Sequence, residues 1–184
     1  MERAGTGDDR KRGAECVLVL GGVRSGKSRH GEAIVTALPG PWTYLATGRA
    51  WDDEMRQRIA HHRATRIAGW RTVEEPLDLP GALDAAADAP VLVDCLTLWL
   101  TNLILDGRDV ALARADLLAA LRRRRALSVL VGNEVGLGIV PETALGRRFR
   151  DEAGLLHQAL AREAARVVFM VAGLPMTVKD TCLP

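Results

Sequence analysis

Short apolar runs rich in β-branched residues alternate along the chain with longer amphipathic or alanine-rich stretches. Five of these runs predict buried strands: Cys16–Leu20, Trp42–Ala46, Val91–Asp94, Ser128–Val131 and Val167–Val171. The stretches between them predict helices: Lys27–Leu38, Asp52–Arg63, Leu77–Ala87, Leu96–Leu105, Val110–Arg124 and Ala144–Ala165. Strands alternating with helices indicate right-handed βαβ units, and therefore a doubly wound α/β fold whose parallel sheet carries helices on both faces.

The composition narrows the class of protein. Hydrophobic residues make up 48% and charged residues 26% of 184 positions, which is typical of a globular protein with one core. We expect a single domain over residues 15–184, preceded by a disordered leader over residues 1–14, which is charged and has no apolar stretch. The net charge of +2 is too small to indicate binding to nucleic acid or to a membrane surface. No apolar run approaches the roughly 18 residues that span a bilayer.

The three cysteines indicate a reducing compartment. Cys16, Cys95 and Cys182 are odd in number, far apart and without C-x-x-C spacing, so the sequence predicts neither a disulfide framework nor a zinc site. We expect reduced thiols and a cytoplasmic location.

A phosphate-binding loop directly follows the first predicted strand. "GGVRSGKS", residues 21–28, matches G-x-x-x-x-G-K-[ST] at every fixed position. In such a loop, backbone N–H groups surround the phosphates at a helix N-terminus, and the lysine, here Lys27, reaches the β- and γ-phosphates. The Ser28 hydroxyl is the expected ligand of Mg²⁺. The predicted nucleotide contacts in the loop are Gly21, Gly22, Val23, Arg24, Ser25, Gly26, Lys27 and Ser28.

Asp94 ends the predicted strand "VLVD" and has two interpretations. A P-loop enzyme needs a carboxylate at the end of a neighbouring strand to hold its metal ion, and Asp94 supplies one. An aspartate at this position could instead cap the following helix, but the P-loop favours the metal role. The sequence argues against a switch GTPase, because Cys95-Leu96-Thr97 follows Asp94 where a GTPase has D-x-x-G.

The remaining polar motifs leave alternatives open. His61 and His62 lie near the end of the predicted helix Asp52–Arg63 in "ATGRAWDDEMRQRIAHHR", on adjacent helix faces, so only one of them is expected to face a ligand. Either histidine could be a nucleophile toward phosphorus, or both could be surface residues. The run Arg122–Arg125 is interpreted as a solvated helix end. Asn133–Gly136 is either a turn with a helix cap or a substrate contact.

Taken in order, these motifs resemble a known enzyme family. "GGVRSGKSRH", "YLATGRAWDDEMRQRIAHHR", "GWRTVEEP", "VLVDCLTLWLTNL", "NEVGLGIVPE", "GRRFRDEAG" and "VAGLP" resemble the adenosylcobinamide kinase/adenosylcobinamide-phosphate guanylyltransferase family of cobalamin biosynthesis. The resemblance implies a RecA-like P-loop NTPase fold and two reactions. ATP or GTP phosphorylates the aminopropanol hydroxyl of adenosylcobinamide, and GMP from GTP is then joined to that phosphate, giving adenosylcobinamide-GDP and pyrophosphate.

The resemblance also assigns residues. It implies that His61 is the guanylylated histidine, with Lys27 as the other catalytic residue. Asp94 corresponds to a carboxylate that contacts metal or nucleotide, so the implied metal ligands are Ser28 and Asp94. The further implied nucleotide contacts are Ala46, Thr47, Gly48, His62, Arg63, Ala64, Thr65 and Glu74. Mg²⁺ and a homotrimer are implied as well. The chain departs from the family at His157, where relatives often have asparagine.

Two other functions are compatible with the same motifs. An enzyme that retained only the kinase or only the guanylyltransferase activity would keep the P-loop. A nucleotide-sensing module would bind without reacting and would form no covalent GMP.

Overall fold

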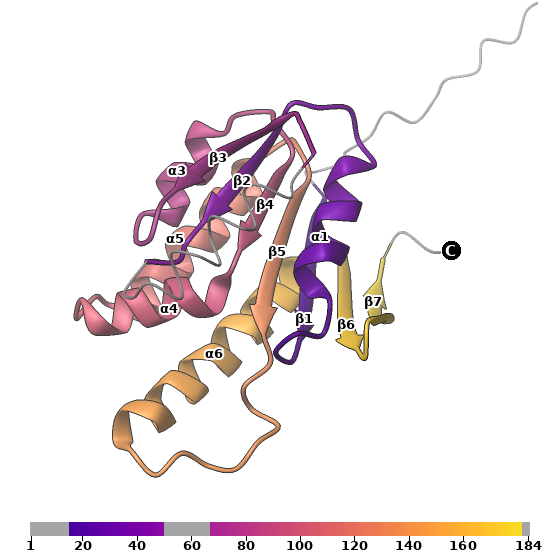
Figure 1. Ribbon diagram of the computed structural model, residues 1–184. Coiled ribbons are helices and arrows are strands. Elements are labelled where there is room, and N and C mark those ends of the chain that lie inside the picture. Colours follow the sequence, from indigo (N-terminus) through magenta and orange to yellow (C-terminus); the bar gives the residue numbers. More distant parts are fainter. Residues whose placement is uncertain (1–14, 50–66, 182–184) are drawn as a thin grey trace, which may run out of the picture.

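The computed structural model describes residues 15–49 and 67–181. The strands of this part form one sheet in the order β3-β2-β4-β5-β1-β6-β7 (Figure 1). All five predicted strands are present. Their bounds are β1 (Cys16–Gly21), β2 (Trp42–Ala46), β4 (Val91–Asp94), β5 (Ser128–Asn133) and β6 (Arg166–Val171). They pair in parallel, as the βαβ pattern predicts.

The two edge strands, β3 (Trp70–Glu74) and β7 (Leu174–Asp180), were not predicted from the sequence. β3 is parallel to β2 but carries polar side chains such as Arg71, and none of its residues is fully buried. β7 is antiparallel to β6 and mostly exposed, and it contains Pro175. Edge strands lack the continuous apolar run by which a central parallel strand is recognised.

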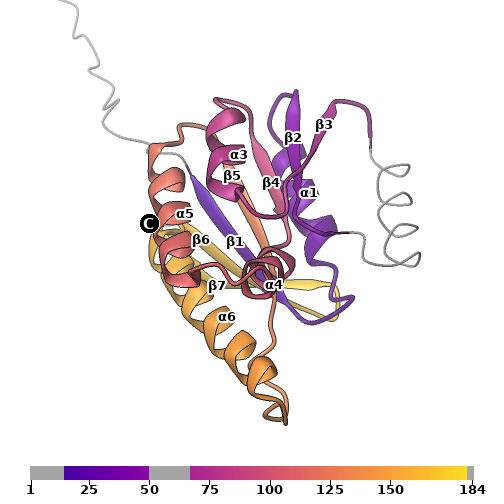
Figure 2. The same cartoon turned by 90° about the vertical axis from the view of Figure 1, so that its left-hand side faces the viewer.

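The described helices cover both faces of the sheet, as predicted. Their bounds are α1 (Lys27–Thr36), α3 (Leu79–Ala85), α4 (Leu96–Leu105), α5 (Val110–Arg123) and α6 (Ala144–Glu163). Among these described helices, α1 packs on one face of the sheet and α3 to α6 pack on the opposite face (Figure 2). The helix predicted over Asp52–Arg63 lies outside the described residues. No helix in the described part is long and apolar enough to cross a membrane.

The alternation of side chains along the strands divides the core into two layers. Leu18, Leu45 and Leu130 pack under α3 to α6, around the fully buried Trp99. Val17, Val19 and other residues of the opposite face pack with Val35 of α1. Successive side chains of a strand point to opposite faces, so each central strand serves both layers.

Strand register brings the polar segments to one edge of the sheet. Gly21 lies beside Asn133, and Ala46 lies between Glu74 and Asp94. The carboxyl ends of β1 to β5 therefore meet at the edge where ligands bind in open α/β sheets.

Candidate functional site

The phosphate loop adopts a compact conformation between β1 and α1. Gly26 is the N-cap of α1 with φ of +92°, a left-handed conformation that favours glycine. The Ser25 amide donates to the Gly22 carbonyl at 3.3 Å, which closes the turn. The first amides of α1 therefore surround the position where phosphates are expected.

Lys27 is folded against its own loop. Its Nζ donates to the Gly22 carbonyl at 2.9 Å, and the residue is 9% exposed. Burial lowers the pKa of the Lys27 ammonium, while the charge of nearby Asp94 acts in the opposite direction. A phosphate arriving in the loop offers this buried cation a charged acceptor in place of a carbonyl.

Asp94 accepts a hydrogen bond rather than capping a helix. Its Oδ2 accepts from the Tyr44 hydroxyl at 2.9 Å, across two neighbouring strands. The N-cap of α4 is Cys95, so the helix-cap interpretation of Asp94 is wrong. Mg²⁺ is commonly held by one or two protein oxygens together with substrate phosphates. The Ser28 hydroxyl and the Asp94 carboxylate fit that donor set.

Thr47 ties the end of β2 to the start of α4. Its hydroxyl donates to the Cys95 carbonyl at 2.7 Å and accepts from the Cys95 amide at 2.9 Å, and the residue is fully buried. The Thr47 carbonyl accepts from Asn102 Nδ2 at 2.7 Å. The side chain of Thr47 is therefore occupied by the protein. Thr47 orders the loop Ala46–Gly48, and a nucleotide would meet that loop through other atoms.

A second polar link joins the ends of β4 and β5. Thr97 Oγ1 accepts from the amide and from Nδ2 of Asn133, at 3.4 and 3.2 Å, and lies 3.0 Å from Cys95 Sγ. Beyond Asn133, the Glu134 amide donates to the Gly21 carbonyl at 3.0 Å. The segment Asn133–Gly136, for which the sequence allows either a turn or a substrate contact, is thus joined directly to the phosphate loop.

The turn between β6 and β7 supports the phosphate loop from the other side. The Gly173 amide donates to the Ser25 carbonyl at 3.2 Å, and a Cβ on Gly26 would lie 3.5 Å from Gly173 Cα. Sequence reasoning missed this contact. The signal for it was "AG" between two apolar runs, a hairpin turn that places Ala172 and Gly173 at positive φ.

Several predicted site residues lie outside the described residues: His61, His62, Arg63, Ala64 and Thr65. Arg49, the last described residue after β2, forms a bidentate ion pair with Asp106 at the end of α4, with N–O distances of 2.7 and 3.0 Å. Glu74 is exposed at the end of β3, beside Ala46. Within the described part, no three histidine, cysteine or acidic side chains gather as a metal site.

His157 is buried in α6 on the face opposite α1. It is 7% exposed, and burial lowers its pKa, an effect that nearby Glu134 partly opposes. The ring packs so closely on β5 that a Cβ on Gly132 would lie 2.8 Å from Nε2. We interpret His157 as a core residue and not as a second nucleophile.

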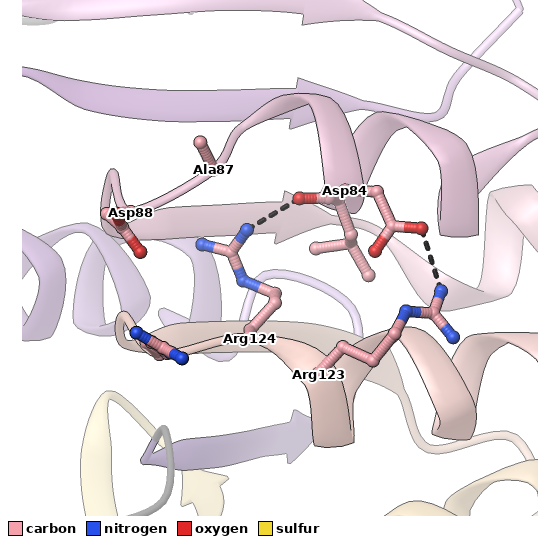
Figure 3. A pocket seen from close by; sticks show the side chains of 7 residues that line it. Asp84, Ala87, Asp88, Arg123 and Arg124 are labelled. Atoms are coloured by element: carbon pink, nitrogen blue, oxygen red, sulfur yellow. Dashed lines mark hydrogen bonds and ion pairs between the residues drawn. The ribbon is translucent and has the colours of Figure 1, made fainter.

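A hollow of about 260 Å³ lies at the opposite edge of the sheet, before β4 and β5 (Figure 3). Its floor is the buried Arg124, which donates to the carbonyls of Leu83 and Ala89, both at 2.6 Å, and to Ser128 Oγ at 2.8 Å. Arg123 pairs with Asp84 at 2.7 Å. The interpretation of the arginine run as a solvated helix end is thus wrong for Arg124. These arginines bind the protein itself and lie far from the phosphate loop.

Comparisons with known proteins agree with this geometry. Residues 17–178 match the family model described as cobinamide kinase / cobinamide phosphate guanyltransferase. The chain is 52% identical over 166 residues to the bifunctional adenosylcobalamin biosynthesis protein CobP of Pseudomonas aeruginosa, covering 88% of this chain and 96% of that one. It is 44% identical over 180 residues to CobU of Salmonella typhimurium, covering 89% and 99%.

Solved structures resemble the chain in fold alone. The ATPase domain of G40P has a TM-score of 0.52 at 11% identity, covering 92% of this chain and 78% of that one. An ATPase of a type III secretion system has a TM-score of 0.56 at 10% identity, covering 89% and 56%. The predicted P-loop fold of the RecA-like kind is therefore confirmed.

Proposed function

Because this chain belongs to the cobinamide kinase / cobinamide phosphate guanyltransferase family, we propose that it catalyses both reactions at one phosphate loop. In the second reaction, His61 carries the GMP group. The protein is a bifunctional enzyme of cobalamin biosynthesis. We further propose that ATP or GTP donates the phosphate in the first reaction and that the substrate is the adenosyl form of cobinamide.

In the kinase step, the phosphate loop holds the nucleotide while the hydroxyl of adenosylcobinamide attacks the γ-phosphorus. Lys27 leaves the Gly22 carbonyl for the β- and γ-phosphates, and the amides at the start of α1 bind their oxygens. Ser28 and Asp94 would hold Mg²⁺, which supplies positive charge against the charge that develops on the leaving group. Tyr44 orients the carboxylate of Asp94 through its 2.9 Å hydrogen bond.

In the guanylyltransferase step, the imidazole of His61 attacks the α-phosphorus of GTP and pyrophosphate leaves. The phosphate of adenosylcobinamide phosphate then attacks the same phosphorus and frees the histidine. A neutral imidazole is a good nucleophile near its ordinary pKa of about 6.5. We assign contacts with the nucleotide to Ala46, Gly48, Glu74 and the segment 62–65, with Thr47 holding the first of these loops in place.

We also propose a cytoplasmic homotrimer. The exposed apolar side chains of β7 support an interface there, because Leu174 is 72%, Met176 53% and Val178 62% exposed on an edge strand. Exposed apolar edges of this kind are usually covered by another chain. Sedimentation equilibrium would test the proposal, and a monomer at micromolar concentration would contradict it.

The match of the family model over residues 17–178, together with the intact phosphate loop, carries the proposal. The experiment uses GTP labelled at the α- or the γ-phosphate, without cobinamide, followed by denaturing electrophoresis. We expect acid-labile label on the protein from the α-labelled GTP alone. The label should disappear in His61→Asn and persist in His62→Asn, the matched control.

The other outcomes select among the alternatives. Bound nucleotide without covalent label, together with phosphorylation of cobinamide, would indicate an enzyme with kinase activity only. Covalent label without kinase activity would indicate an enzyme with guanylyltransferase activity only. Nucleotide binding with neither reaction would leave a sensing module.

A further inference from the structure

We propose that Glu134 is the general base of the kinase step, an inference that rests on the proposed function. The two reactions of this enzyme use different nucleophiles. The hydroxyl of cobinamide must lose a proton as it attacks phosphorus, whereas the phosphate of cobinamide phosphate is already an anion. A general base therefore serves the first reaction and is not needed in the second.

Glu134 emerges from the sheet beside the phosphate loop. Its amide donates to the carbonyl of Gly21, the first residue of the loop, at 3.0 Å. The strand that precedes it, β5, lies between β1 and β4 in the sheet (Figure 1). Glu134 therefore follows the strand that separates the phosphate loop from Asp94. An acceptor hydroxyl must come to this edge of the sheet to reach a γ-phosphate held by Lys27.

The backbone around Glu134 is held on both sides. Asn133 is bound to Thr97 through its amide and its side chain, and Val135 packs against the larger core cluster. One carboxylate oxygen of Glu134, Oε1, accepts from the Gly136 amide. The second oxygen, Oε2, has no hydrogen bond or ion pair with any residue in the described ranges, and the side chain is half-buried. A positioned carboxylate with one free oxygen is the arrangement that a general base requires.

The other described carboxylates at this edge are less suited to the task. Asp94 accepts a hydrogen bond from Tyr44 and lies close to the Lys27 ammonium. In these surroundings the carboxylate is better suited to bind a metal ion than to accept a proton. Glu74 ends β3, which is separated from β1 by three strands. Of these three carboxylates, Glu134 is the one that follows a strand directly adjoining β1.

The proposed step transfers one proton and one phosphoryl group. The substrate hydroxyl gives its proton to Oε2 of Glu134 as its oxygen bonds to the γ-phosphorus. The bond between the γ-phosphorus and the oxygen that bridges to the β-phosphate breaks, and the nucleoside diphosphate leaves with that electron pair. Glu134 then releases the proton to water.

The test compares both reactions in Glu134→Gln. Glutamine keeps an oxygen for the Gly136 amide but cannot accept the proton. Kinase turnover is measured with cobinamide and ATP, and guanylyl transfer with GTP and cobinamide phosphate made beforehand. We expect kinase kcat to fall about 100-fold, which is within the usual range for loss of a general base. The KM for ATP and the rate of guanylyl transfer should change less than twofold. Glu142→Gln, an exposed carboxylate after the same strand, is the matched control and should leave both rates unchanged.

Each remaining outcome decides a different question. Unchanged kinase activity in Glu134→Gln would overturn the assignment, and equal loss of both activities would overturn it in favour of a structural role. Normal guanylyl transfer shows that the variant is folded. Absence of both activities in the unmodified protein would instead overturn the proposed function.

Discussion

Replacing the buried Arg124 by methionine should destabilise the protein without affecting its chemistry. The guanidinium joins three segments: the last turn of α3 through Leu83, the loop before β4 through Ala89, and the start of β5 through Ser128. The residue is 5% exposed, so water cannot take its place at these groups. Methionine has similar length and no donor, so the variant removes the hydrogen bonds while filling most of the space.

The size of the effect follows from the contacts. Hydrogen bonds to a charged group contribute about 1.5–3 kcal/mol each, and a buried acceptor without a partner costs about 1–3 kcal/mol. The carbonyls of Leu83 and Ala89 and the buried Ser128 hydroxyl each lose the donor that Arg124 supplies. Burying the charged guanidinium costs desolvation free energy, and the same burial lowers the pKa of Arg124. The methionine variant avoids this cost, which offsets part of the loss. We therefore expect a net loss of about 3–5 kcal/mol, or about 10 °C in Tm for a domain of this size.

Urea denaturation followed by circular dichroism at 25 °C measures this loss. The control is Arg125→Met, which changes the exposed neighbour at the same hollow and should cost less than about 0.5 kcal/mol. Arg124→Lys should fall between the two, because one ammonium cannot reach all three diverging acceptors. Below its melting range, Arg124→Met should keep both activities, since Arg124 lies at the edge opposite the phosphate loop. A loss under 1 kcal/mol would refute the reasoning.

Two further predictions concern the buried polar groups near the site. Thr47→Val, which keeps the shape of the side chain, leaves the buried Cys95 amide without an acceptor, while the Cys95 carbonyl still accepts from the Trp99 amide. The variant should cost about 1–3 kcal/mol in urea denaturation, and a cost below about 0.5 kcal/mol would contradict the described pairing. His157, whose pKa burial lowers, is neutral when folded but protonated when unfolded at mildly acid pH, so stability should fall as pH drops through about 6.5, by up to about 1.4 kcal/mol per pH unit. His157→Gln should flatten this dependence on the acid side of pH 6.5, and equal slopes in both proteins would rule out His157 as its source.

Part of the candidate site was readable from the sequence because its chemistry is local. Gly26, Lys27 and Ser28 are neighbours in the chain, and their spacing alone defines a phosphate loop. Asp94 could be placed because it ends an apolar run that had to be a strand. Whether it capped a helix or held a metal ion was undecided, since that depends on Tyr44, which lies 50 positions away.

The missed parts are contacts between distant segments. The bond from Gly173 to the phosphate loop depends on an edge hairpin that has no continuous apolar pattern. The arginine run contains one buried member, and composition cannot distinguish Arg124 from the exposed Arg125.

The sequence by itself determined the central strands, the helices between them, the phosphate loop and the family. Each follows from side-chain period, backbone propensity or fixed spacing, which act over a few residues. Only the tertiary structure decided strand order and register, and with them that Glu134 meets Gly21 and that Thr47 holds Cys95. These pairings join residues from 48 to more than 100 positions apart. They depend on how whole strands pack together, which no local pattern encodes.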